Sequence, residues 1–383
     1  MNTITMTQRR FPATLAATAL LLVGLALPAG AKKPPKPPPE PPPEPGLTYS
    51  LTELDVSAGF VSSQAIGTNA AGAAAGSTES DAGVSHAAVW PTASDPPIDL
   101  GSDFESSAAY ALNSHGEVVG VADEQPVIWV PGPGGYEAIV LSTGEGDASD
   151  INEDGVVTGT VTFPGSGDLA YVVVPEDFDG DGLLDWYCDE NPTDGFNDLL
   201  VLLEPDSFFT LGININDYGW VAGGGFSFVV IPDDMNGDGL LDWFWDANGD
   251  GWNDLSTGLP KAFDINNLGQ VVDDDLLMQL ELSPDGTVTY TATTLPLPRK
   301  ITSLSARAIN DAGMVVGKAA SRQGPKAFIW ETEAGTTMLQ DLVTDMATFD
   351  KLEEAWDINL AGQIVGTGIT DAGPRGFLAT PNN

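Results

Sequence analysis

The chain has 383 residues and a formal net charge of −41, from 55 acidic against 14 basic side chains. A surface of this sign repels DNA, RNA and anionic lipid, so the composition argues against nucleic acid as a partner. Two compatible explanations of the charge remain: a surface solvated in a salty medium, and carboxylates neutralised by divalent cations. Cys188 is the only cysteine, so no internal disulfide staples the fold.

Residues 1–31 have the organisation of a secretory signal peptide. An Arg-Arg pair precedes the apolar run ATLAATALLLVGLALP, and Ala-Gly-Ala at the end supplies the small residues of a cleavage site. The run is short for a spanning helix, which needs ~20 apolar residues, so a cleaved signal is favoured over an uncleaved anchor. We therefore expect a secreted protein (extracellular, at the cell surface or periplasmic) without a transmembrane segment after signal removal.

Residues 32–46 form a proline-rich segment, KKPPKPPPEPPPEPG. Such a composition favours extended polyproline II and acts as a semi-rigid spacer. Two interpretations stay open, a stalk between a cell surface and the folded part, and an inert linker.

The chain from 47 to 383 repeats one unit seven times, at about 45 residues per unit, a period typical of solenoids and propellers. Each unit carries Asn-x-x-Gly between two β-forming runs, and the asparagine can cap a turn while the glycine takes a positive φ. The shared asparagines are Asn69, Asn113, Asn152, Asn216, Asn266, Asn310 and Asn359.

Each unit predicts four short strands. Ala-x-x-Ile precedes the turn, x-Val-Val-Gly follows it, a third run such as KAFIW often ends in an aromatic, and a looser fourth run carries Leu. Four strands in about 45 residues is the size of a propeller blade.

The two ends of the repeat region are complementary. The chain finishes at RGFLATPNN, the third strand of unit seven, and the repeats open with TYSLTELD, a fourth strand without its blade. If the first strand completes the last blade, no edge remains exposed. We therefore predict an all-β, seven-bladed β-propeller closed by an N-terminal strand, with an open β-solenoid as the alternative.

The unit resembles the HAF repeat of bacterial extracellular proteins, most closely in unit six, ARAINDAGMVVG followed by KAFIW. Unit one departs from the pattern with a run of alanines, and unit five with Asp273 in place of the closing glycine. The resemblance implies export and a repeat fold, and it implies no activity.

Two acidic inserts, at 176–198 and 233–254, contain the spacing Asp-x-Asp/Asn-x-Asp-Gly-x-x-Asp in three places. Calcium takes six to eight oxygens, and side chains at positions 1, 3, 5 and 9 with the carbonyl at position 7 can supply them around a glycine turn. The predicted calcium ligands are Asp177, Asp179, Asp181, Leu183, Asp185, then Asp234, Asn236, Asp238, Leu240, Asp242, and then Asp246, Asn248, Asp250, Trp252, Asp254.

These loops lack a glutamate at position 12, so they are similar to the calcium loops of thrombospondin type 3 repeats and not to whole EF-hands. Glu190, Asp194 and Asp198 offer the remains of a fourth, degenerate site, but Pro192 replaces a ligand there, which argues against metal binding by this segment. Because all the donors are hard oxygens, we expect a bound metal to stabilise the fold and not to take part in catalysis. The alternative is that these segments are acidic turns that bind no metal. The step of unit four is short, which predicts trimmed strands there.

No catalytic motif is present. Asp150, Asp264 and Asp357 recur just before the Ile-Asn pair, where turn chemistry is favoured over glycoside cleavage. Aromatic residues beside the loops form either a binding face or a small core: Trp186, Tyr187, Trp243, Phe244, Trp245 and Trp252.

The sequence thus predicts a non-catalytic, secreted, calcium-binding module, expected to be a monomer, whose partner is an unknown protein or a polysaccharide. The alternatives are an extracellular carbohydrate-active enzyme with an unrecognised site and a structural surface spacer.

Overall fold

The protein is described by a computed structural model that covers residues 47–382, except 179, 190–195, 204–209, 226, 261 and 285. The predicted signal peptide and the proline-rich linker lie outside the described residues. So do Asp179 and two members of the degenerate fourth site, Glu190 and Asp194.

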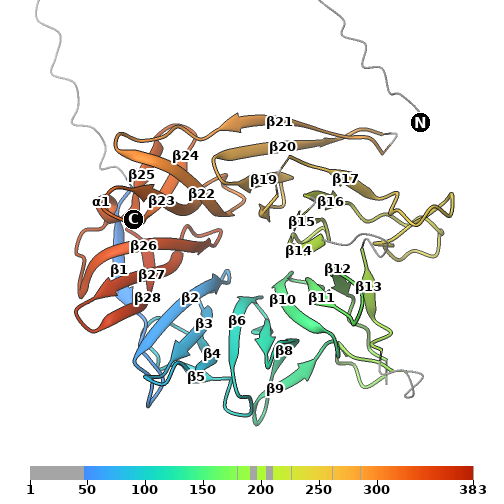
Figure 1. Ribbon diagram of the computed structural model, residues 1–383, viewed down its shortest axis with the longest axis horizontal. Helices are drawn as coiled ribbons and strands as arrows, with labels where there is room; N and C mark the ends of the chain where they lie inside the picture. Colours follow the sequence, from blue (N-terminus) through green and yellow to red (C-terminus); the bar gives the residue numbers. More distant parts are fainter. Residues whose placement is uncertain are drawn as a thin grey trace, which may run out of the picture. The chain divides into compact units, whose positions relative to one another are not determined.

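The chain forms seven antiparallel four-stranded sheets arranged as the blades of a β-propeller. Figure 1 shows the blades following one another around a central channel in chain order. The predicted fold class is therefore confirmed.

In six blades the strands run outward from the channel in sequence order, and in the seventh the outermost strand comes from the start of the described chain. Blade 1 comprises β2 (Ser62–Thr68), β3 (Ala74–Glu79), β4 (Ser85–Trp90) and β5 (Ile98–Asp99). Blade 2 comprises β6 (Ser107–Leu112), β7 (Val118–Ala122), β8 (Gln125–Gly132) and β9 (Gly135–Val140). Blade 3 comprises β10 (Glu145–Ile151), β11 (Val157–Thr162), β12 (Asp168–Val173) and β13 (Leu200–Leu202). Blade 4 comprises β14 (Thr210–Ile215), β15 (Val221–Gly225), β16 (Phe228–Val230) and β17 (Ser256–Gly258).

The remaining blades follow the same order. Blade 5 comprises β18 (Asp264–Ile265), β19 (Gln270–Asp273), β20 (Leu276–Leu282) and β21 (Val288–Thr294). Blade 6 comprises β22 (Ile301–Ile309), β23 (Val315–Ser321), β24 (Lys326–Glu331) and β25 (Gly335–Met338), followed by the short helix α1 (Leu339–Leu342). Blade 7 comprises β26 (Phe349–Ile358), β27 (Ile364–Thr370), β28 (Gly373–Pro381) and, from the other end of the chain, β1 (Tyr49–Glu53).

The ring closes as the sequence predicts. Strand β1 pairs antiparallel with β28, from Tyr49 opposite Pro381 to Glu53 opposite Phe377. Tyr49 is completely buried there, in the cluster that joins blades 6 and 7. This pairing gives the last blade its fourth strand and removes the open edge that a solenoid would leave.

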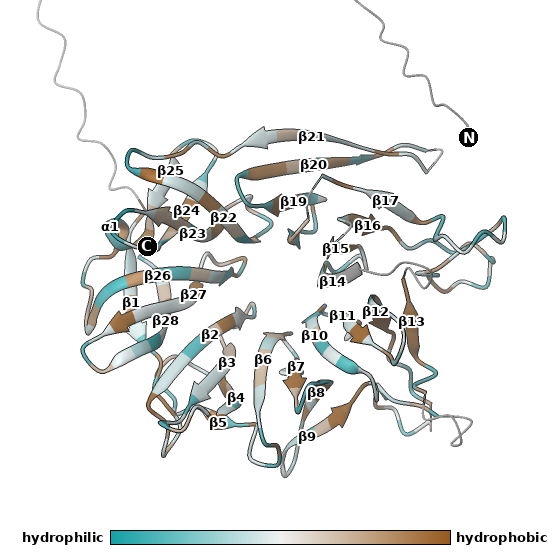
Figure 2. Ribbon diagram, in the orientation of Figure 1, coloured by the Kyte–Doolittle hydropathy of each residue, from teal (hydrophilic) through white to brown (hydrophobic). Residues whose placement is uncertain are grey.

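The hydrophobic core is divided among the interfaces between blades. The seven buried clusters each combine residues from two neighbouring blades, as when Val119 and Ile128 of blade 2 pack with Val157 and Tyr171 of blade 3. Figure 2 shows the corresponding hydrophobic stretches on the strands, for example on β13. Each blade therefore depends on its two neighbours for burial of its faces.

The alanine-rich unit one still forms a complete blade. Ala74 and Ala75 are buried, and the fully buried Trp90 supplies the bulk that the alanines lack. The indole Nε1 of Trp90 donates to the carbonyl of Asp55 at 2.9 Å. Small side chains are therefore tolerated because one large neighbour fills the space.

A β-bulge recurs in the innermost strand, three residues before the motif asparagine, in every blade but the fifth. The motif's closing glycine lies opposite it: a Cβ on Gly317 would stand 2.1 Å from the Ser305 carbonyl oxygen. Blade 5 carries Asp273 at that position, and its innermost strand β18 spans only two residues. The glycine therefore allows the bulged strand to approach closely.

Candidate functional site

The two acidic inserts are the connections between the third and fourth strands of blades 3 and 4. The first joins β12 to β13 and the second joins β16 to β17, at the outer edge of the ring (Figure 1). Strands β13, β16 and β17 each have three residues. Blade 4 is thus trimmed, as its short repeat predicts.

The three predicted calcium loops adopt one hydrogen-bonding pattern. The aspartate at position 1 accepts the N–H of the position 6 glycine, at 3.1 Å for Asp177, 3.0 Å for Asp234 and 2.8 Å for Asp246. The aspartate at position 5 accepts the N–H of position 7, and that at position 9 accepts the N–H of position 2, in each loop. Three loops from two blades therefore fold locally in the same way.

Glycine is required twice in each loop. In the second loop Gly237 and Gly239 have φ of +79° and +93°, a region that L side chains rarely adopt. The double turn brings Asp234, Asn236 and Asp238 onto the inside of a tight coil of hydrogen bonds. Position 6 was the only glycine that the calcium pattern itself predicted, and position 4 is a second one.

The donor set fits a hard cation such as calcium, because it consists of carboxylate, amide and carbonyl oxygens. In the part of the chain that the structure describes, no three His, Cys, Asp or Glu side chains are gathered closely enough to hold a metal ion. The ligand at position 3 of the first loop, Asp179, falls outside that part. Calcium binding therefore stays a prediction.

The inserts are anchored to the inner turns of their own blades by two tryptophans. Trp186 donates its indole N–H to the Gly155 carbonyl at 2.8 Å, and Trp243 donates to the Gly219 carbonyl at 3.0 Å. Both side chains are buried, whereas Trp252 is 57% exposed. Of the two interpretations of the aromatic cluster, the small core therefore holds for Trp186 and Trp243.

A buried asparagine locks each insert further. The amide of Asn197 donates to the carbonyls of Leu141 and Trp186, and that of Asn253 donates to those of Leu203 and Trp243. The two inserts thus repeat the same anchor.

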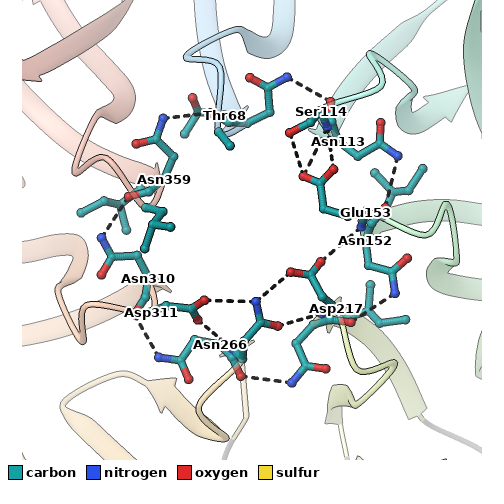
Figure 3. Close-up of a pocket in the computed structure, with 18 of the residues that line it drawn as sticks. Thr68, Asn113, Ser114, Asn152, Glu153, Asp217, Asn266, Asn310, Asp311 and Asn359 are labelled. Atoms are coloured by element: carbon teal, nitrogen blue, oxygen red, sulfur yellow. Dashed lines mark hydrogen bonds between the residues drawn. The ribbon is translucent and has the colours of Figure 1, made fainter.

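The motif asparagines form a closed ring of hydrogen bonds around the channel (Figure 3). Each side-chain Nδ2 donates to the backbone carbonyl of the asparagine in the next blade, at distances of 2.8–3.2 Å. Each Oδ1 also accepts N–H groups of its own turn, as Asn310 does from Ala312 and Met314. The predicted turn cap is therefore confirmed, and the bond between blades is a second role that sequence analysis missed.

The residues after these asparagines surround a cavity of about 470 Å³ at this mouth of the channel. Asp217 accepts the N–H of Glu153 at 3.2 Å and the amide of Asn267 at 2.7 Å. Asn267 also donates to Asp311. Three carboxylates, those of Glu153, Asp217 and Asp311, thus lie at the mouth and bond to neighbours in the same ring (Figure 3).

Asp150, Asp264 and Asp357 lie deeper in the channel and clamp blades together. Asp150 accepts the N–H of Ile215 in blade 4 at 2.9 Å, Asp264 that of Ile309 in blade 6 at 2.7 Å, and Asp357 that of Thr68 in blade 1 at 2.7 Å. Each also accepts the N–H of the residue that follows it. Their recurrence therefore serves contacts between blades in addition to the turn chemistry predicted from sequence.

Burial raises the pKa of each of these three carboxyls, and for Asp357 it raises the pKa to about 7. The charge of Asp264 raises the pKa of Asp150 and Asp357 further. The backbone N–H groups that they accept act in the opposite direction, but burial is the larger effect. The channel therefore holds a carboxyl, that of Asp357, whose protonation changes near neutral pH.

These carboxyls share a second cavity, of about 280 Å³, with residues that sequence analysis did not select. Arg307 lies between two rings, its guanidinium carbon 5.1 Å from the centre of Phe263 and 5.0 Å from that of Trp356. Its Nε donates to Glu354 at 2.9 Å. A comparison of the seven units at the third residue before the asparagine would have marked these positions, because the residue type differs between blades.

The described residues contain no helix long and apolar enough to cross a membrane. Comparison of the sequence with protein-family models and with curated proteins finds no match to either. The resemblance to the HAF repeat and to thrombospondin-like calcium loops accordingly stays a prediction that depends on the motifs alone.

Proposed function

We propose that this protein is a secreted, non-catalytic calcium-binding repeat protein that acts as a binding or adhesion module at or outside the cell surface. The observation that supports it is the shared hydrogen-bonding pattern of the three acidic loops. Local sequence alone can make one such turn, but three turns with the same hydrogen bonds in two blades support a common ligand.

The chemistry of the loops supports calcium over other cations. Their donors are hard oxygens, which suit calcium and magnesium better than zinc or copper. Backbone N–H groups, foremost that of Gly251, lower the pKa of Asp246 and so keep it ionised. Clustered carboxylates repel one another, and a bound divalent cation relieves that repulsion.

Calcium would act here as a clamp on blades 3 and 4. The strands that flank the inserts, β13, β16 and β17, have three residues each and therefore few ladder bonds. The inserts reach the inner turns of these blades through Trp186 and Trp243. A cation that stiffens the inserts would thus stabilise a part of the ring where the neighbouring strands are short.

The exposed aromatic residues beside the loops support a binding role. Tyr187 is 38% and Trp252 57% exposed, and aromatic side chains are favoured in contacts with proteins and sugars. The partner would be a protein or a polysaccharide at the cell surface. A spacer would bind neither, and a carbohydrate-active enzyme would turn the polysaccharide over.

Thermal unfolding of the purified protein in calcium, in excess EDTA and in magnesium at equal ionic strength tests the calcium proposal. Ligand that binds only the folded state raises Tm with its concentration. We expect a calcium-specific rise that is reduced in Asp238→Ala and Asp250→Ala. Asp81→Ala removes an exposed carboxylate outside the loops and should keep the full rise. If wild-type Tm is the same in calcium and EDTA, the calcium proposal is wrong and the inserts become candidates for an acidic protein-binding surface.

A further inference from the structure

The second channel cavity is chemically distinct from the calcium loops. Its walls come from the two positions at the recurring bulge, which turns consecutive residues toward the channel where a regular strand would turn only one. The polar and aromatic residues at the second position are Asp150, Asn214 and Asp357, and those at the first are Tyr110, Ser149, Arg307 and Trp356. Blade 5 has no bulge in its described residues but adds Phe263 and Asp264 from the same positions of its unit. Carboxylates, an amide, a hydroxyl, a guanidinium and aromatic rings therefore meet in about 280 Å³.

Comparison of the seven units separates the positions that every blade needs for its structure from the positions where the residue type varies. The motif asparagine is the same in all seven units because every blade needs the same bond to its neighbour. The third residue before the asparagine instead varies, with isoleucine in units one and four and a different residue type in each of the other five. Some of these side chains pack across blades, as Arg307 does on Phe263 and Trp356. The bond that all seven blades share does not fix the residue type here, so a ligand is a further reason for polar and aromatic groups at this position.

Arg307 provides hydrogen-bond donors to this cavity. Among the described residues its guanidinium bonds to the protein only through Nε, to Glu354. Its side chain is 24% exposed, and the two flanking rings fix its plane. The planar group is thus held in place with its outer N–H groups available to an acceptor.

Trp356 provides a second unpaired hydrogen-bond donor beside this cavity. Its indole Nε1 is buried and has no hydrogen-bond partner among the described residues, although a buried donor without an acceptor is costly. The residue lines the cavity. An acceptor on a bound molecule would satisfy this donor.

We propose that this cavity binds a neutral, polyhydroxylated molecule, a single sugar unit. Anions are disfavoured because Arg307, the one cationic side chain among the described residues that line the cavity, is already paired with Glu354. A simple cation would lie beside the fixed positive charge of Arg307 and leave its outer N–H groups without an acceptor. A hydroxyl group can donate to a carboxylate and accept from a guanidinium at the same time. The C–H faces of a sugar ring also pack on aromatic side chains such as Tyr110 and Trp356. The proposal does not depend on calcium binding.

Binding is measured by ligand-observed saturation-transfer NMR and calorimetry on the full chain. The sugar probes are glucose, galactose, mannose and N-acetylglucosamine. The control ligands are the free amino acid glycine (zwitterionic), choline (cationic) and acetate (anionic). We expect at least one sugar to bind and the charged probes not to bind. Binding of none of the sugars, or of glycine or choline instead, would overturn the proposal.

Two substitutions locate the site. Ser149→Phe puts into blade 3 the residue that blade 5 carries at the same position, Phe263, so the blade should accept it while the ring fills the cavity and abolishes binding. Arg307→Gln should weaken binding about tenfold or more through loss of a charged donor.

The matched control is Lys318→Gln. Lys318 contacts the same carboxylate as Arg307, Glu354, at 2.8 Å, but it does not line the cavity. It should leave sugar affinity unchanged. Sugar binding that persists in folded Ser149→Phe, or an equal loss in Lys318→Gln and Arg307→Gln, would place the site elsewhere and overturn the assignment. If Ser149→Phe does not fold, the comparison of Arg307→Gln with Lys318→Gln decides.

Discussion

The side-chain amide of Asn359 donates to the backbone carbonyl of Asn69 at 2.8 Å, across 290 positions of sequence. This bond closes the asparagine ring at the point where the last blade meets the first. The strand pairing of β1 with β28 closes the outer side of the same blade. The propeller is thus locked twice, once at the channel and once at the rim.

Replacement of Asn359 tests the inner closure. Asn359→Ala removes the bond to Asn69 and the cap on the N–H of Gln363, at 2.9 Å. Since the side chain is buried, we expect a loss of about 2 kcal/mol in the free energy of unfolding. Leu360→Ala is the control, because Leu360 lies in the same turn but is 66% exposed. Equal denaturation midpoints for the two variants would show that the ring bond adds nothing.

Two substitutions of Tyr49 test the outer closure. Tyr49→Ala empties a fully buried site between blades 6 and 7, and we expect a loss of about 3–5 kcal/mol. The Tyr49 hydroxyl is buried without a hydrogen-bond partner among the described residues. Tyr49→Phe should therefore be neutral or stabilising by about 1 kcal/mol. Urea unfolding of both variants measures this, and a strongly destabilised Tyr49→Phe would contradict the unpaired hydroxyl.

Trp243 should hold the second insert against blade 4. Trp243→Ala removes a buried ring and its bond to Gly219, so we expect about 3–5 kcal/mol of destabilisation and faster proteolysis within 233–254. Trp252→Ala changes an exposed tryptophan in the same insert and should leave Tm unchanged. Limited proteolysis with mass spectrometry locates the cleavage. Equal sensitivity of the two variants would argue against the anchor.

Asp357 should make stability depend on pH between about 4 and 7. Its pKa is raised by burial to about 7 in the folded protein, so the folded state holds a proton that the unfolded state has released. Its contribution is therefore fully present below the unfolded pKa and is lost as pH rises through about 7.

The variant Asp357→Asn removes this titration. We expect the decline of its Tm from pH 5 to pH 8 to be shallower than that of the wild type, measured by differential scanning calorimetry. Asp81→Asn, at an exposed turn, should follow the wild-type slope. A decline in Asp357→Asn as steep as in the wild type would mean that this carboxyl does not titrate in the window.

The sequence alone determined the repeat, the strand order within each blade and the closure by the first strand. These follow from local rules, because Asn-x-x-Gly makes the same turn wherever it occurs and alternating apolar residues make strands. It also located the inserts after the third strands and predicted trimmed strands in blade 4. The sequence also predicted the three acidic loops, because each spans nine residues and the hydrogen bonds that shape it join residues close together in the chain.

Only the tertiary structure decided what the repeated positions do to one another. The asparagine bond from blade to blade, the clamps of Asp150, Asp264 and Asp357, and the stacking of Arg307 join residues that are about 45 positions or more apart. The bulge that aims consecutive residues into the channel appears only when the glycine of one strand faces the carbonyl of the next. Sequence periodicity cannot show such contacts, because they depend on how the blades are placed around a common axis.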